Sequence, residues 1–426
     1  MSTVQFQAIL RSAVGLLVLA CAATAATLVH LDARQDVASF RETVDVIEFD
    51  VRVVTNKGQP ILGLTPDKFD VTLNGSKRRV VSASVIKYGR DAAGRSAEVE
   101  AASSALPSLQ RSPLPTGFAG RIFVLVVDAS TFDAMAMAGV GKAARAFVSQ
   151  LRPDDYVGLF VFPTGSQINP TTDRLRVMNA VERIPGTPTV KPGTTFDLRP
   201  GEVVSLAPIV NDRTDRDSAR IVQALCGTEP ECATRLRNEV AGLIEDYELH
   251  ALQSLNLLNQ LIANLANIQG RKTLVVLSGG IPTSSRPGGR PDVGNLDLQI
   301  GQAAIRTNTS IYTLFVDWRY TQQFTATQRQ SRRVVTTLLE DSDALSRTLE
   351  VFTGASGGAL FKTLSGNGEV AIKRILDETS AYYVLGVEPA SSDRDGKPRQ
   401  LSVKVHESGA TVRGSRWVTV PQRQGP

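Results

Sequence analysis

The residues best suited to chemistry in this 426-residue chain lie where an apolar run ends. In "RIFVLVVDASTFDA", Asp128 closes the run and the hydroxyl residues Ser130 and Thr131 follow it. Carboxylate and hydroxyl oxygens are the donors that a hard cation such as Mg²⁺ prefers. The stretch therefore raises the hypothesis of a divalent-metal site. The structural alternative is that Asp128 caps the next helix or accepts from loop amides.

The sequence Gly354-Ala-Ser356-Gly-Gly358 matches G-x-S-x-G, the motif around the catalytic serine of α/β-hydrolases. That nucleophile elbow requires a strand before the serine and a helix after it. Here "DALSRTLEVFTGASGGALFKT" predicts a helix that ends at the glycines and a short strand after them. The only later histidine, His406, falls in a strand that we assign to another part of the chain. We therefore expect no enzyme.

Residues 119–376 alternate between predicted strands and helices. Apolar runs at 121–128, 156–162, 271–278 and 310–317 are typical of strands that are covered on both faces. Between them, Val140, Ala144 and Phe147 fall on one helical face, and further helices are predicted around 173–184 and across 228–268. This βαβ order predicts an α/β domain of the Rossmann-like kind, with a mainly parallel sheet and helices on both faces.

Both flanks of that domain read as β structure. Residues 44–88 alternate apolar and polar side chains and include the Asn74-Gly75 turn, and residues 377–420 alternate in the same way. A few strands at each end would be marginal alone, so we expect the two ends to pair into one β-sandwich. Residues 89–118, rich in Ala, Ser, Pro and Gly, are interpreted as a linker.

The N-terminus predicts export. Residues 1–26 have a basic start, an apolar segment and the small-residue end Ala23-Thr-Ala25, which is the pattern of a secretion signal peptide. An uncleaved membrane anchor and a lipoprotein modified at Cys21 are the alternatives. We expect a periplasmic, cell-envelope or extracellular protein that meets the membrane only through this segment.

Composition and the two mature-chain cysteines indicate which classes of partner to expect. The net charge is +5, but no basic cluster is interleaved with aromatic residues, so a nucleic-acid partner is not expected. A protein partner remains. Cys226 and Cys232 are predicted to form a disulfide in an exported chain, with two free thiols as the alternative. Without a nearby histidine they do not make a zinc site.

The stretches "RIFVLVVDAST", "DDYVGLFVF" and "GRKTLVVLSGG" together resemble a von Willebrand factor A (VWFA) domain. The flanks "FRETVDVIEFDVRVVTNKGQPILGLTPDKFDVTLNG" and "SAYYVLGVEPASSDRDGKPRQLSVKVH" resemble those of exported bacterial VWFA-related proteins. The resemblance implies a metal-ion-dependent adhesion site at the top of the sheet. There, one coordination position of Mg²⁺ stays open for a carboxylate of the partner protein.

The family pattern is Asp-x-Ser-x-Ser in one loop, a threonine in a second and an aspartate in a third. Asp128 and Ser130 match the first loop, and Thr194 or Thr195 is the candidate in the second. Phe132 stands where the third hydroxyl belongs, and Gly279 stands where the aspartate belongs. The resemblance thus implies a degenerate site, with no cofactor or at most weak Mg²⁺ binding.

These observations predict an exported, non-enzymatic protein-interaction or adhesion module of the cell envelope. Its alternatives are a Mg²⁺-dependent receptor for a partner carboxylate and, more remotely, a serine hydrolase that uses Ser356. The insertion at 196–250 is longer than an A domain requires. We expect it to cover the top of the sheet and to help set partner choice.

Overall fold

The computed structural model describes residues 46–88, 120–186, 195–319, 337–363 and 368–422, and the backbone of 99–101. The predicted signal peptide at 1–26, nearly all of the linker at 89–118, and Thr194 lie outside the described residues. Within the described part, no helix has both the length and the apolar character needed to cross a membrane.

A six-stranded sheet forms the centre of the α/β domain, in the order β10-β9-β8-β5-β6-β7. Its strands are β5 (Ile122–Asp128), β6 (Tyr156–Phe162), β7 (Gln167–Thr171), β8 (Lys272–Ser278), β9 (Thr309–Val316) and β10 (Leu360–Thr363). Every neighbouring pair is parallel except β6 and β7. The predicted mainly parallel sheet is confirmed. Every residue of β5, β8 and β9 is buried, which explains why apolar residues predominate in them.

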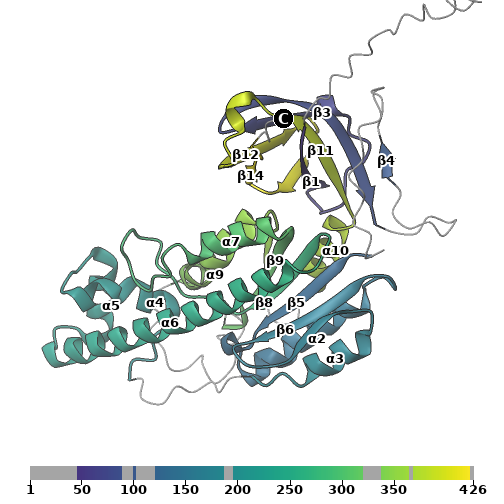
Figure 1. Cartoon of the computed structure of the whole chain (residues 1–426). Helices are drawn as coiled ribbons and strands as arrows, with labels where there is room; N and C mark the ends of the chain where they lie inside the picture. Colours follow the sequence, from purple (N-terminus) through teal and green to yellow (C-terminus); the bar gives the residue numbers. More distant parts are fainter. Residues whose placement is uncertain are drawn as a thin grey trace, which may run out of the picture. The chain divides into compact units, whose positions relative to one another are not determined.

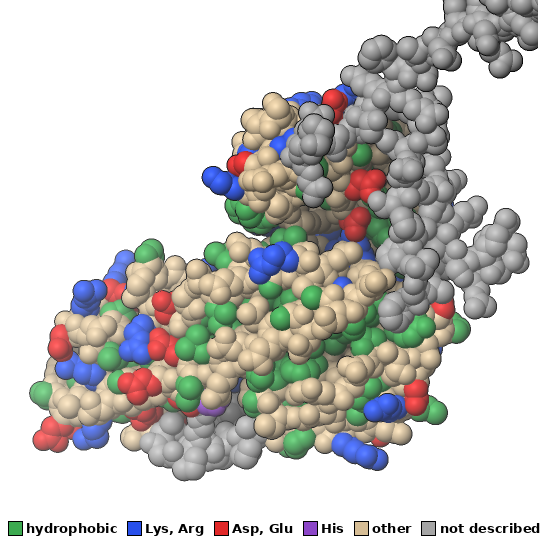
Figure 2. Space-filling model, viewed as in Figure 1, with side chains coloured by type: hydrophobic (Ala, Val, Ile, Leu, Met, Phe, Trp, Pro, Cys, Tyr) green, Lys and Arg blue, Asp and Glu red, His purple; other side chains and the backbone are tan. Residues whose placement is uncertain are grey.

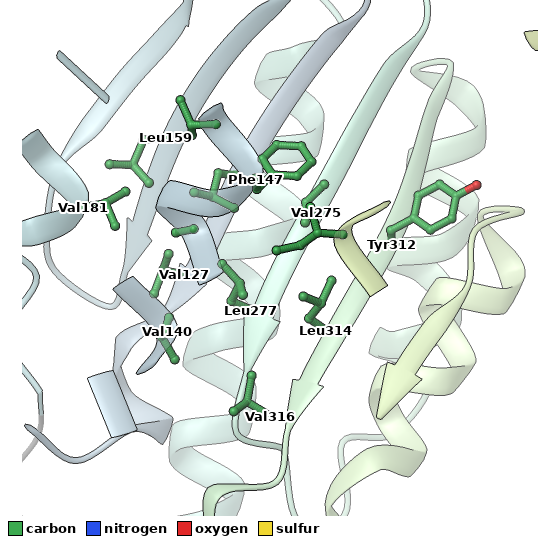
Figure 3. Packing of buried hydrophobic residues seen from close by; sticks show 14 of the residues in the cluster. Val127, Val140, Phe147, Leu159, Val181, Val275, Leu277, Tyr312, Leu314 and Val316 are labelled. Carbon is green, nitrogen blue, oxygen red and sulfur yellow. The ribbon is translucent and has the colours of Figure 1, made fainter. Parts of the chain in front are cut away.

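Helices cover both faces of this sheet, as predicted (Figure 1). On one face lie α2 (Ala134–Ser149), α3 (Arg174–Glu182) and α10 (Glu369–Glu378). On the other lie α6 (Pro230–Leu265), α7 (Leu296–Arg306) and α9 (Leu338–Ala355). Figure 3 shows Val275 and Leu277 of β8 on the same side of the sheet as Val140 and Phe147 of α2. Because strand side chains alternate, Val124 and Val126 of β5 serve the opposite core.

The segment between α3 and the middle of α6 is a helical insertion with its own core. It contains α4 (Pro200–Leu206), the short helix η3 (Ala207–Asn211) and α5 (Arg216–Cys226). Its buried side chains, separate from both sheet cores, are Val203, Leu206, Ala207, Ile209, Ile221, Leu236, Val240 and Ile244. The predicted disulfide is confirmed, since Cys226 is bonded to Cys232 with their Cα atoms 5.5 Å apart. Figure 2 shows charged side chains gathered over α5 and the start of α6.

The two ends of the chain pair with each other, as predicted. They supply β1 (Ile47–Thr55), β2 (Phe69–Leu73), β3 (Ser76–Lys87), β4 (Val99–Ala101), β11 (Ala381–Glu388), β12 (Pro398–Val405), β13 (Ala410–Gly414) and β14 (Trp417–Thr419). The short helices η1 (Pro66–Lys68) and η4 (Ser391–Asp393) lie between these strands. Asn74 and Gly75 both have positive φ and form the predicted hairpin turn between β2 and β3.

The predicted sandwich is instead one curled antiparallel sheet, in the order β13-β1-β11-β3-β2-β12-β14 with β4 beside β3. The long strand β3 is the reason. Its residues Ser76–Arg78 pair with β2, and its residues Arg79–Lys87 pair with β11, so the hydrogen bonds pass continuously from one half to the other. Both halves surround a single core.

Candidate functional site

Asp128 lies at the carboxyl end of β5, where the strand order changes direction. The chain passes from β5 to β6 on one side, and later enters β8 on the other side of β5. In parallel α/β sheets, ligands bind at such a switch point, outside the carboxyl ends of the strands. The sequence-based choice of Asp128 therefore falls at the position where this topology favours a site.

The Asp128 carboxylate is almost fully enclosed. Its exposed fraction is 1%, and each oxygen accepts one hydroxyl hydrogen bond. Ser130 Oγ donates to Oδ1 at 2.7 Å, and Ser278 Oγ donates to Oδ2 at 3.1 Å. Burial raises the pKa of Asp128 to about 6, although both hydroxyls and the nearby His250 act in the opposite direction. Both carboxylate oxygens of Asp128 thus have hydroxyl partners.

A second set of contacts closes the loops around Asp128. Thr131 Oγ1 donates to the Asp128 carbonyl at 2.8 Å and accepts from the Gly279 N–H at 2.8 Å. Trp318 Nε1 donates to the Thr131 carbonyl at 2.9 Å. Arg319 lies over the Trp318 ring and donates to the Gly279 carbonyl at 3.2 Å. The ends of β5, β8 and β9 are therefore joined by hydrogen bonds between side chains and backbone groups.

The residues present do not fit the octahedral Mg²⁺ site that the resemblance implies. A Cβ at Gly279 would lie 2.6 Å from the Thr131 carbonyl oxygen and 2.9 Å from Trp318 Nε1. The aspartate of the family pattern therefore has no room at this position. Phe132, in place of a hydroxyl, is 1% exposed and belongs to the hydrophobic core. Asp128 and Ser130 alone supply too few oxygen ligands for a Mg²⁺ shell.

Asp133, and not Asp128, caps the helix that follows the Asp128 loop. Its Oδ1 accepts from the Ala136 N–H at 2.6 Å, so Asp133 is the N-cap of α2. Asp128 instead precedes the short helix η2 (Ala129–Thr131) and makes no side-chain cap hydrogen bond. The expectation that Asp128 caps the following helix or accepts from loop amides is wrong. Its described side-chain partners are hydroxyls, and η2 separates it from α2.

Of the four predicted site residues, the structure brings Asp128 and Ser130 together. Thr195 is exposed, and its N–H donates to Glu239 of α6 at 2.7 Å. Phe196, the next residue, packs against the core of the helical insertion, to which Val240 of α6 also belongs. Thr195 therefore belongs to the helical insertion. A binding role for these residues stays a prediction.

Sequence reasoning missed Ser278, Trp318 and Arg319. Ser278 was visible as the hydroxyl residue that ends the apolar run "TLVVL". At the carboxyl edge of a parallel sheet, that position is adjacent to Asp128. Trp318 and Arg319 carried no such signal, because their contacts are to backbone carbonyls of two distant loops.

Ser356 has the contacts of a structural residue. It is 4% exposed, its Oγ donates to the Thr353 carbonyl at 2.9 Å, and it accepts from the Ile311 N–H at 3.0 Å. As predicted, a helix precedes it and the short strand β10 follows it. His406 contacts Asp70 at 2.7 Å in the curled sheet. The described contacts do not join Ser356 to His406.

No protein-family model matches the chain, and no curated protein matches it. An aerotolerance-related membrane protein from Bacteroides fragilis is 15% identical and covers 61% of this chain and 98% of its own, with a TM-score of 0.30. BatB from Bacteroides thetaiotaomicron is 14% identical with the same coverage and TM-score. Proximal thread matrix protein 1 from the mussel byssus, solved with a zinc-occupied MIDAS motif, is 7% identical, covers 63% of this chain and 48% of its own, and has a TM-score of 0.30. These TM-scores are too low to assign a fold, which rests here on strand order.

Proposed function

We propose that the chain is an exported, non-enzymatic protein-interaction module of the cell envelope, built on a VWFA-like domain that acts without a metal ion. The observation that carries this proposal is the closed Asp128 site. Its carboxylate is buried, and both of its oxygens accept hydrogen bonds from hydroxyls. The atoms packed around Gly279 leave no room for a second carboxylate at that position. A site of this kind holds the loops in place and offers no open coordination position.

The same edge of the sheet offers a surface for a partner. Met135 in the first turn of α2 is 77% exposed, and Leu339 in the first turn of α9 is 68% exposed. Both helices follow parallel strands, so both begin at the carboxyl edge where Asp128 lies. Apolar side chains at this edge favour a partner that is recognised by packing rather than through a cation.

Metal independence is tested by isothermal titration with Mg²⁺ or Mn²⁺. We expect no binding below the millimolar range. A micromolar affinity that is lost in Asp128→Ala would instead establish the alternative, a metal-dependent receptor for a partner carboxylate.

The interaction surface is tested by affinity capture from an envelope extract, with and without EDTA. Capture should be insensitive to EDTA and should be lost in Met135→Glu. Leu175→Glu is the matched control, because Leu175 is 69% exposed and also lies in the first turn of a helix, but at the opposite edge of the sheet. Equal loss in both variants, or loss with EDTA, would contradict the proposal.

A further inference from the structure

A small cavity lies at the amino edge of the parallel sheet, at the opposite end from Asp128. Its volume is about 10 Å³, and three arginines line it: Arg52 of β1, Arg121 just before β5, and Arg271 just before β8. Tyr88 and Tyr382 contribute to the wall. A volume of roughly 10–15 Å³ holds one water-sized species. The cavity therefore combines room for a single small species with three guanidinium groups.

Among the described residues, Arg52 is a buried cation that forms no ion pair with a carboxylate. It is 2% exposed, and its Nη2 donates to Ser310 Oγ at 2.8 Å and to the Gly357 carbonyl at 2.9 Å. Both acceptors are uncharged, and its Nε has no hydrogen-bond partner. Burial lowers its pKa, which is the effect of removing the guanidinium from water. A buried charge in this condition is costly unless a counter-ion accompanies it.

The other two lining arginines have carboxylates of their own. Arg121 forms a two-pronged pair with Asp155, with Nε at 3.0 Å and Nη2 at 2.6 Å from its oxygens. Arg271 pairs with Asp50, but its Nε is also buried without a partner. Neither carboxylate is therefore free to neutralise Arg52.

The surrounding charges do not balance within the described residues. Glu378 is the next carboxylate, and it already serves Arg374 at 2.9 Å, Arg413 at 3.5 Å and the hydroxyl of Tyr312. Five guanidinium groups thus face three carboxylates, which are those of Asp50, Asp155 and Glu378. The excess of two positive charges attracts an anion.

We propose that this cavity binds one small monatomic anion, chloride in a physiological medium, which accepts hydrogen bonds from the unpartnered Nε–H groups of Arg52 and Arg271. A water molecule would satisfy these donors and leave the charge of Arg52 uncompensated. Phosphate and sulfate exceed a cavity that holds one water-sized species. Because Arg52 belongs to the curled sheet and Arg271 to the α/β domain, the anion strengthens the contact between the two.

Crystals soaked in sodium bromide test the proposal directly. We expect an anomalous bromide peak within hydrogen-bonding distance of Arg52 Nε and Arg271 Nε, and no peak there in Arg52→Met. A refined water without anomalous signal in the wild-type chain would overturn the proposal. This measurement uses the wild-type protein, so it remains decisive even if the variant fails to fold.

A second test is thermal unfolding of the full chain at constant ionic strength, with sodium gluconate replaced stepwise by sodium chloride. An anion bound only by the folded state raises the Tm with the logarithm of its concentration. We expect this rise in the wild type and in Arg145→Met, which removes an exposed arginine, and its loss in Arg52→Met. A Tm that is independent of chloride in the wild type, or a rise that is equal in all three proteins, would refute the proposed site.

Discussion

The two edges of the parallel sheet handle buried charge in opposite ways. At the carboxyl edge, the buried carboxylate of Asp128 lies between two serine hydroxyls, and burial raises its pKa, which favours the neutral form. At the amino edge, arginines outnumber carboxylates, and Arg52 is held by an uncharged hydroxyl and a carbonyl. At one edge a buried carboxylate has only hydroxyl partners among the described residues, and at the other a buried guanidinium has only uncharged acceptors among them.

The difference separates two uses of polar residues in one scaffold. The contacts around Asp128 join the ends of strands that are neighbours in one sheet, as in the bond between Gly279 and Thr131. The arginine contacts instead join the curled sheet to the α/β domain, as in the bond from Arg52 to Ser310 and the pairing of Arg271 with Asp50. The proposed binding surface therefore lies outside the Asp128 contacts, whereas at the amino edge the buried charge itself is the feature to test.

The largest expected loss of stability comes from removing a buried ion pair at the amino edge, that of Arg121 with Asp155. Arg121→Met leaves Asp155, which is 0% exposed, without its guanidinium partner. Breaking a buried pair by removing one partner costs about 3–5 kcal/mol of unfolding free energy. Urea unfolding measures this loss. Arg145→Met, which breaks an exposed pair with Glu182, should cost less than about 1 kcal/mol. Equal losses in the two variants would contradict the importance of the buried charges.

At the carboxyl edge, the sign of the pH dependence is the test. Because burial raises the pKa of Asp128 to about 6, above the roughly 3.9 of an unfolded aspartate, its contribution to stability is lost as the pH rises between these values. Asp128→Asn removes this ionisation. Relative to wild type, it should gain on the order of 2–3 kcal/mol between pH 4 and pH 7.5.

Urea unfolding at both pH values measures that gain. Asp343→Asn, which removes an exposed carboxylate paired with Lys362, is the control and should show no comparable change with pH. A larger stability of Asp128→Asn at pH 4 than at pH 7.5, relative to wild type, would mean that the carboxylate is stabilised in its charged form. That outcome would support a bound cation at Asp128.

Much of the fold could be predicted because it depends on local patterns. The buried strands are continuous apolar runs, the helices have one apolar face, and Asn74-Gly75 has the backbone preference of its turn. The curling of the end strands into one sheet could not be predicted. It depends on how far β3 continues past its pairing with β2, and no pattern within β3 marks that point.

The site was predictable only in its first loop. The sequence showed that Phe132 and Gly279 replace two ligand positions of the VWFA pattern. The structure adds that an aspartate at position 279 would clash with its neighbours unless they also changed. The arginine cavity was not foreseen. Arg52 alternates with apolar neighbours in β1, which is typical of a solvent-facing strand residue, yet the α/β domain covers it.

A smaller effect sharpens the description of the carboxyl edge. Gly279→Ala places a Cβ against the Thr131 carbonyl, and overpacking of this kind costs about 1–3 kcal/mol. Gly242→Ala is the control, because nothing lies within 4 Å of its Cβ position in the middle of α6 and alanine favours a helix. It should stabilise the protein slightly. If Gly279→Asp folded and bound Mg²⁺ at micromolar concentrations, the claim that the contacts around Gly279 exclude a carboxylate would be wrong.

The smallest expected effect concerns Ser356, which lies beside the Gly357 carbonyl that accepts from Arg52. Ser356→Ala removes the acceptor of the buried Ile311 N–H, so we expect a loss of about 1 kcal/mol of unfolding free energy. We expect no ester hydrolysis by the wild type or by the variant. Ser149→Ala, which removes an exposed hydroxyl at the end of α2, should be close to neutral. Measurable hydrolysis by the wild type that disappears only in Ser356→Ala would turn the amino edge from a structural region into a catalytic one.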